Sequence, residues 1–478
     1  MALPKITLFN TLTNKKETLE TIQEGMVNIY ACGPTVYNYT HVGNARASIT
    51  PDFVVRVLKS AGYKVKYLSN ITDVDDKIIK AANDEGCDPG ELAKRFEAAF
   101  IKEMHQVGNN EPDGRPRATE HISEMVAMIE KLIAKDYAYA ADTPFGKDVY
   151  FRVTKFEGYG KLSKRHLDDM IAGARIEPGE TKQNPLDFAM WKSAKPGEPS
   201  WSSPWGEGRP GWHIECSAMV DKHFPNGIDI HMGGLDLIFP HHENEIAQSE
   251  SCNEHAFAKY WVHNGMLTVE REKMSKSLGN FFLTKDFFEK FGAETLRLLF
   301  LQQHYRSPID FSEESILRTE AMLERIYNAK QTLQSKGEPG DSEACSLCSQ
   351  IKEAVYDDFN SAKALGFFLK SLRIAFKENT DAAWKEWGRG LSLLNSIFGI
   401  ANAEPQTALE GIKQRRFARS GKNSSYCESV DKRLIERQQL REARDFDAAD
   451  QIRKDLESEG VLIMDGPDGT AWQLKAGS

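Results

Sequence analysis

The sequence lacks a long uninterrupted apolar segment. None of its apolar runs reaches the roughly 20 residues that a membrane-spanning helix needs, and its first stretch, MALPKITLFNTLTNKKE, has no extended apolar part of the secretory type. The composition, 40% hydrophobic and 27% charged, is typical of a folded soluble protein. We therefore expect a cytoplasmic chain with no membrane partner, long enough at 478 residues for about three domains.

Cysteine is also sparse. An odd number of cysteines scattered over a long chain predicts reduced thiols and excludes a disulfide framework. Cys345 and Cys348 form a C-x-x-C pair that resembles half a zinc knuckle, but no second Cys/His pair follows at a suitable spacing, so we assign the pair no function. The seven cysteines are Cys32, Cys87, Cys216, Cys252, Cys345, Cys348 and Cys427.

Positive charge is not in excess, since 61 basic residues face 70 acidic ones and the net charge is −9. This total does not favour a nucleic-acid partner, but such binding depends on local patches. Residues 413–422, KQRRFARSGK, carry five positive charges and no acidic residue. Two interpretations stay open for this segment: a solvated linker, or a contact with RNA phosphates.

The common phosphate-binding motifs, G-x-x-x-x-G-K-[ST] and G-x-G-x-x-G, are absent, so a nucleotide would have to be held in another way. HVGN, residues 41–44, forms a compact turn before an expected helix, where free N–H groups and the helix dipole favour anions and Gly43 permits close approach. Far downstream, REKMSKSLGN places Lys273 and Lys276 in a polar loop, where their ammonium groups can neutralise a departing pyrophosphate. Each motif alone is weak, whereas the two in this order are specific.

The order of the predicted elements indicates an α/β fold. A buried strand in VNIYACGPTVY, a helix in NARASITPDFVVRVLKSAGY and a strand in KVKYLSNITDVDD make one half of a doubly wound, parallel-sheet (Rossmann-like) domain. A helical bundle and a small α+β module with two short strands follow. The expected divisions are a split catalytic domain at 1–120 and 205–311, a connective insertion at 121–204, the bundle at 312–403, a linker at 404–426 and the terminal module at 427–478.

Four residues form a candidate metal set. His241 and Glu245 lie four residues apart in PHHENE, so they share one face of a helix. Cys216 in GWHIECSAM and Cys32 at the end of the first strand add two thiolates, which together give a tetrahedral set suited to zinc. The H-E-x-x-H motif of metalloproteases is absent, since residue 246 is isoleucine.

Several long segments carry a family resemblance. YACGPTVYNYTHVGNAR, NITDVDDKII, GWHIECSAM, GGLDLIFPHHENEIAQSE, KMSKSLGNFF and the C-terminal DFDAADQIRKDLESEGVLIMDGPDGTAW together resemble the cysteinyl branch of the class I aminoacyl-tRNA synthetases. The likeness covers essentially the whole chain. HVGN departs from the family's His-Ile-Gly-His, but Asn44 retains a hydrogen-bonding side chain.

The resemblance implies roles for these residues. It implies one Zn²⁺ on Cys32, Cys216, His241 and Glu245, with the substrate thiolate as a further ligand, and Thr72 and Trp212 in the amino-acid pocket. The roles of His213, His231 and His242 stay open. ATP with Mg²⁺ would contact His41, Gly43, Asn44 and Lys276, and catalysis would rest on His41, Asn44, Lys273 and Lys276. The anticodon of tRNA(Cys) would meet Arg441, Phe446, Asp450 and Asp465.

The expected activity is ATP-dependent attachment of L-cysteine to tRNA(Cys), by a monomer with no obligate protein partner. Serine differs from cysteine only in OH for SH, and an apolar pocket separates such isosteres by about 10²-fold. Zinc prefers a thiolate, so metal ligation can supply the missing discrimination. The alternative is a ligase that joins cysteine to a small-molecule amine, and the terminal module discriminates because such a ligase would have no use for it.

Overall fold

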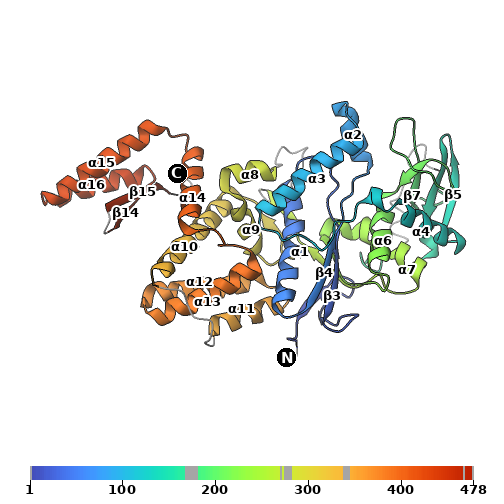
Figure 1. Cartoon of the computed structure of the whole chain (residues 1–478), viewed down its shortest axis with the longest axis horizontal. Coiled ribbons are helices and arrows are strands. Elements are labelled where there is room, and N and C mark those ends of the chain that lie inside the picture. Colours follow the sequence, from blue (N-terminus) through green and yellow to red (C-terminus); the bar gives the residue numbers. More distant parts are fainter. Residues whose placement is uncertain are drawn as a thin grey trace.

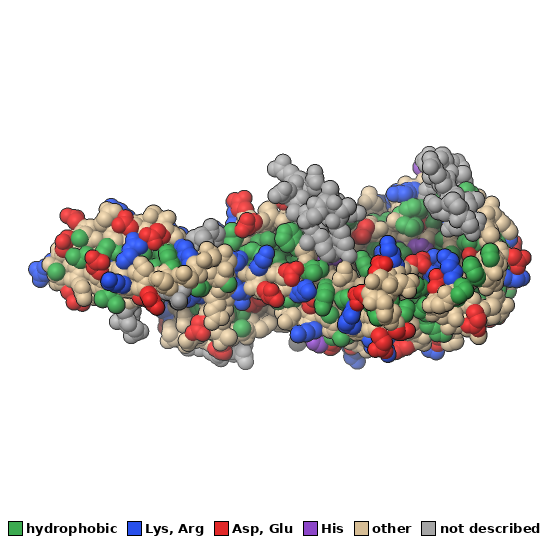
Figure 2. Space-filling view, turned by 90° about the horizontal axis from the view of Figure 1, so that it is seen from above, with side chains coloured by type: hydrophobic (Ala, Val, Ile, Leu, Met, Phe, Trp, Pro, Cys, Tyr) green, Lys and Arg blue, Asp and Glu red, His purple; other side chains and the backbone are tan. Residues whose placement is uncertain are grey.

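The computed structural model describes residues 3–166, 181–269, 272–273, 282–336, 345–466 and 469–475. The molecule is elongated (Figure 1), with an antiparallel sheet at one end, a parallel sheet in the middle, a group of helices beside it and a small module at the other end. In the space-filling view, acidic and basic side chains are interspersed over the visible face (Figure 2). Within the described residues, no helix is both long and apolar enough to cross a membrane.

A four-stranded parallel sheet lies at the centre, in the order β10-β9-β3-β4. Its strands are β3 (Met26–Ala31), β4 (Lys64–Ser69), β9 (Ile228–Gly234) and β10 (Ala258–Asn264). All seven residues of β9 are buried, as expected of a central strand covered on both faces. The parallel order confirms the predicted α/β class, because parallel neighbours need crossover connections.

Helix α1 (Val42–Ser60) makes the crossover from β3 to β4 and buries Ile49, Phe53, Val54, Val57 and Leu58. Two further helices, α2 (Asp76–Glu85) and α3 (Pro89–Gln106), follow β4 and begin at capping aspartates, Asp75 and Asp88. Short strands flank the domain: β1 (Thr7–Asn10) pairs with β2 (Lys15–Thr18), and β11 (Leu267–Val269) pairs with β12 (Glu272–Lys273) and β13 (Ile309–Asp310).

The insertion between β4 and β9 is built on an antiparallel sheet, β5-β6-β7-β8. Its last strand, β8, lies entirely beyond residue 204, where we expected the insertion to end. Helix α4 packs on α6 and α7, and His121 Nε2 lies 3.1 Å from His223 Nε2 where α4 meets α6. The elements are β5 (Ala138–Thr143), β6 (Gly146–Phe151), β7 (Phe188–Ser193), β8 (Gly208–Pro210), α4 (Ile122–Ala134), α6 (Trp212–His223) and α7 (Glu243–Asn253). Short 3₁₀ or π turns cover Ala118–Glu120, Val153–Lys155, Leu235–Leu237 and Ile238–His242.

Helices follow from residue 284. They are α8 (Thr284–Phe291), α9 (Ala293–Leu301), α10 (Glu313–Lys336), α11 (Ser346–Tyr356), α12 (Ser361–Glu378), α13 (Asp381–Phe398) and α14 (Pro405–Arg419). The terminal module, far from the central sheet in Figure 1, consists of α15 (Ser424–Glu442), α16 (Phe446–Ser458), β14 (Val461–Gly466) and β15 (Gly469–Leu474). The two short strands predicted around Asp-Gly-Pro-Asp-Gly are therefore present.

Two expectations need correction. The segment 404–426 was expected to be a linker without periodic structure, but most of it is α14, which packs on α10. Its first half packs Ala408, Leu409 and Ile412 on the core, a spacing that sequence reasoning overlooked, and in its second half buried Arg416 bonds Glu320 and Glu324. Reduced thiols were expected throughout, but Cys345 and Cys348 are joined as a disulfide at the start of α11, with Cα atoms 5.1 Å apart. The other five cysteines are free.

Candidate active site and metal centre

A cavity of about 330 Å³ opens at the carboxyl ends of β3, β9 and β10. Ligands bind at this edge in open α/β sheets, because the strands end there and the loops diverge. The wall is drawn from four separate segments of the chain together with Lys77 and Trp212. These segments are residues 32–37, 41–48, 234–237 and 264–267.

The first signature motif lies on the wall of this cavity. His41 precedes α1, and Gly43 and Asn44 lie in its first turn; all three line the cavity. The Val42 amide at the start of the helix donates to Phe282 O at 3.1 Å. Only the first lysine of the second motif, Lys273 at the end of β12, belongs to the described residues, and Lys276 lies outside them.

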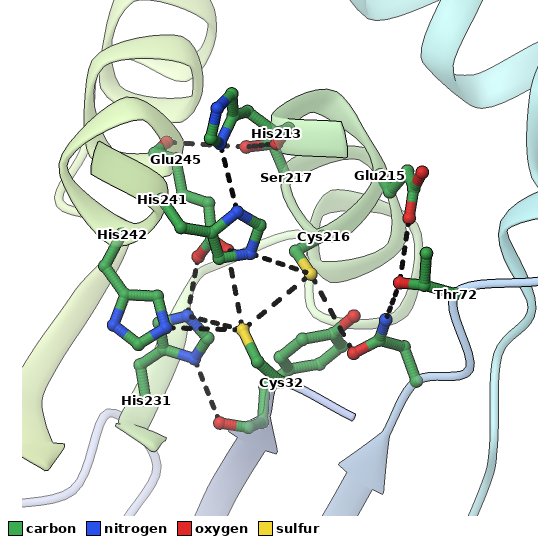
Figure 3. A network of polar contacts seen from close by, with 12 residues as sticks. Cys32, Thr72, His213, Glu215, Cys216, Ser217, His231, His241, His242 and Glu245 are labelled. Carbon is green, nitrogen blue, oxygen red and sulfur yellow. Dashed lines mark hydrogen bonds and ion pairs between the residues drawn. The ribbon is translucent and has the colours of Figure 1, made fainter. Parts of the chain in front are cut away.

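Two thiols, an imidazole and a carboxylate converge beside the cavity (Figure 3). Cys32 Sγ lies 3.8 Å from Cys216 Sγ and 3.5 Å from Glu245 Oε1. His241 Nε2 lies 3.8 Å from Cys216 Sγ and 2.7 Å from Glu245 Oε1. One donor atom from each of the four lies within 4.8 Å of the others. The sequence-predicted quartet is thus brought together, although residues 32 and 245 are far apart in the chain.

The spacing suits a tetrahedral ion. Two Zn–S bonds of about 2.3 Å at the tetrahedral angle place their sulfur atoms about 3.8 Å apart, which is the separation of the two cysteines. Two soft sulfur donors with one imidazole and one carboxylate form a donor set that favours zinc over magnesium or calcium. The residues therefore fit the metal that the resemblance implies, and its binding here stays a prediction.

Three further histidines surround the quartet, and each contacts a different member of it. His231 Nε2 bonds Glu245 Oε2 at 2.6 Å, and its Nδ1 lies 3.0 Å from Tyr30 O. His242 Nε2 lies 3.3 Å from Cys32 Sγ, so Cys32, His231, His242 and Glu245 form a second, overlapping set of possible ligands. His213 Nδ1 is 3.0 Å from the far nitrogen of His241, the place of a residue that orients a ligand imidazole.

Burial and mutual contact shape the charges in this cluster. Burial works against ionisation of Glu245, but His241 and His231 outweigh it and hold the pKa of that carboxyl well below its usual range. Contact with Cys32 lowers the pKa of Cys216 to about 7, whereas burial raises the pKa of Cys32. Metal binding requires thiols to lose their protons, and the lowered pKa of Cys216 favours this loss.

Local structure explains how each donor reaches the cluster. Cys32 directly follows β3, and its amide donates to Met232 O of β9 at 3.1 Å. At Gly33 the chain passes so close to β4 that a Cβ would lie 1.6 Å from Asn70 O, which only glycine tolerates. Cys216 projects from α6, and His241 and Glu245 lie where the turn before α7 enters the helix.

The two predicted pocket residues occupy different positions. Trp212 lines the cavity and stacks on His241, with ring centroids 4.0 Å apart. Thr72 is buried to one side of the cluster, beyond Cys216 (Figure 3), where its hydroxyl donates to Glu215 Oε2 at 3.0 Å and accepts a bond from Asn70.

The residues predicted to meet the anticodon lie in the terminal module. Arg441 lies in the last turn of α15, Phe446 begins α16 and is 59% exposed, Asp450 is exposed on α16, and Asp465 is in β14. An aromatic ring this exposed contributes little to a core and leaves a face open for stacking.

Some cavity residues were not found from the sequence. Lys77, in the first turn of α2, places its ammonium 5.7 Å from the Tyr37 ring centroid on the cavity wall. Arg46, four residues after Val42 in α1, lies at the base of the cavity. The only sequence signal for either was its closeness to a motif, since single basic residues on helices are common.

Comparison with known proteins agrees with this geometry. Residues 18–321 match the model of the tRNA synthetases class I (C) catalytic domain. The chain is 46% identical to a cysteine–tRNA ligase of Geobacter sulfurreducens, over 98% of this chain and 99% of that protein, and 45% identical to one of Anaeromyxobacter dehalogenans, over 98% and 100%.

More distant solved structures share the fold. A methionyl-tRNA synthetase of Mycobacterium tuberculosis bound by methionyl-adenylate aligns with a TM-score of 0.59 at 15% identity, over 83% of this chain and 96% of that one. A LeuRS–tRNA–LeuAMS complex from Agrobacterium radiobacter aligns with a TM-score of 0.56 at 12% identity, over 85% and 86%.

The curated matches extend through the terminal module, a part that a ligase for a small amine would not need. They therefore favour the tRNA-charging interpretation over its alternative. With a class I catalytic domain over most of its length and near-complete coverage of these relatives, the chain belongs to the cysteine–tRNA ligase family of class I aminoacyl-tRNA synthetases.

Proposed function

We propose that this chain activates L-cysteine with ATP and transfers the cysteinyl group to tRNA(Cys), with the quartet of Cys32, Cys216, His241 and Glu245 selecting the substrate thiol. The observation that carries the proposal is the position of this quartet beside a cavity that the HVGN motif also lines. An amino acid and a nucleotide bound there would lie close together, which the first step requires.

The quartet would hold one Zn²⁺, which when bound supplies a preference for a thiolate over a hydroxyl. The residues around it keep the site in shape. Glu245 is fixed from both sides by His231 and His241, and Trp212 covers the outer face of His241. These contacts hold the carboxylate ionised and the imidazole oriented before a substrate arrives.

In the first step, a carboxylate oxygen of cysteine attacks the α-phosphorus of ATP, and the bond to pyrophosphate breaks. The carboxylate is already ionised at neutral pH, so no protein base is needed, and catalysis consists of positioning and charge stabilisation. His41 and Asn44 would contact the phosphates from the start of α1, and Lys273 and Lys276 would neutralise the leaving group, with Mg²⁺ accompanying ATP.

In the second step, a ribose hydroxyl of the terminal adenosine of tRNA attacks the acyl carbon, and AMP leaves. Class I membership favours the 2′-OH. The exposed ring of Phe446 would stack on an anticodon base, and Arg441, Asp450 and Asp465 would contact its neighbours. A cytoplasmic location stays a prediction from composition.

ATP–pyrophosphate exchange with cysteine and with serine tests the proposal. We expect exchange with cysteine, and exchange with serine lower by about 10⁴-fold. An apolar pocket alone would lower it by only about 10²-fold, so the remaining difference would come from the metal. Cys216→Ser should lose bound zinc and cysteine-dependent exchange. The matched control is Cys252→Ser, a buried free cysteine outside the quartet, which should keep both. Equal exchange with both amino acids would exclude metal-based selection.

A further inference from the structure

Arg46 is an unusual residue at the base of the cavity. It is only 1% exposed, and its guanidinium donates to four backbone carbonyls. Nη1 bonds Gly265 O at 2.8 Å and Met266 O at 3.0 Å, and Nη2 bonds Tyr305 O at 2.9 Å and Ser307 O at 2.6 Å. These carbonyls belong to two segments about 40 residues apart, and both are remote from α1 in the chain.

No carboxylate of the described residues pairs with this charge. Burial lowers the pKa of Arg46 to about 10, so it remains protonated at neutral pH. A buried cation that is compensated only by carbonyl dipoles is costly, and a fold that merely needed packing would be served by an apolar side chain. A planar fork of N–H groups can hold four carbonyls at once, which lysine cannot do.

One of the two segments held by Arg46 forms part of the cavity wall, and the other packs against it. Residues 264–267 line the cavity, and β11 begins at Leu267 on the way to Lys273. The second segment, 305–307, leads into β13, which pairs with β11. The Gly265 amide also donates to Tyr305 O at 2.8 Å. The two segments approach so closely that a Cβ on Gly265 would lie 2.4 Å from Ser307 O.

We propose that Arg46 is a positioning residue for ATP. It fixes the wall 264–267 against α1. The distance between the start of this helix, at His41 and Asn44, and the strand that leads to Lys273 is therefore held constant across the bound nucleotide. This role rests on the proposed function, since the cavity must receive ATP. It predicts that loss of the guanidinium impairs nucleotide use and spares the quartet, whose residues Arg46 does not touch.

Arg46→Lys tests the role, with KM measured separately for ATP and cysteine in pyrophosphate exchange. Loss of several hydrogen bonds to a charged group should raise KM for ATP by about 10-fold or more. KM for cysteine and zinc content should stay near the native values. In Arg46→Ala, millimolar guanidinium should restore part of the activity, because the vacated space adjoins the cavity. A purely structural residue would not give this split.

The matched control is Arg297→Lys. Arg297 is also fully buried and donates to carbonyls, among them Phe398 O and Val107 O, but it joins α9 to Asp52 and the bundle and does not line the cavity. It should lower stability without a selective change in KM for ATP. Gly265→Ala provides an independent perturbation, because its Cβ would push the two segments apart, and it should reproduce the effect of Arg46→Lys.

The outcomes separate the two proposals. Absence of cysteine-dependent exchange in the native protein rejects the proposed function itself. Native exchange combined with an unchanged KM for ATP in Arg46→Lys, or with equal rises in both KM values, rejects only the role of Arg46. If Arg46→Lys is insoluble, Gly265→Ala decides between the same two results.

Discussion

Glu320 in α10 allows the attachment of α14 to be tested. Its carboxylate is fully buried and accepts bonds from Arg416 Nε at 2.8 Å and from Arg419 Nη2 at 3.0 and 2.9 Å. Arg416, itself 3% exposed, has Glu324 as its other acidic partner. Glu320→Gln keeps the shape of the side chain and removes its negative charge, so Arg416 and Arg419 each lose an acidic partner.

The expected cost follows from these contacts. Breaking a buried ion pair by removing one partner costs about 3–5 kcal/mol, and the remaining amide oxygen and Glu324 recover part of this. We expect a loss of about 3 kcal/mol in the free energy of local opening, a population increase of about 100-fold. Hydrogen–deuterium exchange of the α14 amides measures this quantity directly.

Because α14 connects the bundle to the terminal module, the two catalytic steps should respond differently. Exchange of pyrophosphate should stay near the native rate, whereas charging of tRNA should fall. Glu314→Gln is the control, since Glu314 lies on the same helix in an exposed pair with Arg318, and such pairs contribute about 0–1 kcal/mol. Equal α14 exchange in the two variants, or an equal loss of both activities in Glu320→Gln, would refute the reasoning.

Three further predictions concern other parts of the chain. Burial and a neighbouring imidazole lower the pKa of His223 below its unfolded value of about 6.5, so the unfolded state binds more protons in acid. Stability should therefore fall as the pH drops below about 6.5, and denaturation of His223→Gln should show a weaker dependence; an equal dependence would contradict this. Thiol titration of the unfolded protein should find five reactive groups before reduction and seven after it, because Cys345 and Cys348 are paired, and seven before reduction would exclude the disulfide. Phe446→Ala should change the unfolding free energy by less than about 0.5 kcal/mol yet lower charging of tRNA without lowering exchange, whereas Ile435→Ala, equally exposed on α15, should lower neither; unchanged charging in Phe446→Ala would exclude stacking.

The sequence predicted the features that local chemistry determines. Strand β3 and the position of the thiol that follows it could be predicted from the sequence, because an apolar run ends at a Gly-Pro turn. The carboxyl ends of parallel strands meet at one edge, which is why Cys32 could be expected near residues more than 180 positions away. His241 and Glu245 were linked by helical spacing alone.

Features that depend on distant partners were not predictable in this way. The second half of α14 is rich in arginine, and the burial of Arg416 depends on Glu320 and Glu324, which lie about 90 positions earlier. Arg46 has backbone carbonyls as partners, and these leave no trace in side-chain patterns. The charges at Cys32 and Cys216 depend on their mutual contact and on the groups that surround them.

The central sheet has a consequence for synthesis of the chain on the ribosome. Strand β3 pairs with β9 through Ile29 and Ile230, residues about 200 positions apart, and the insertion must be translated between them. At roughly 5–20 residues per second, β9 emerges on the order of 10–40 s after β3. Throughout that interval one edge of an apolar strand has no neighbour, and such edges invite aggregation. A nascent chain stalled within the insertion should therefore depend on chaperones more than one stalled after β10.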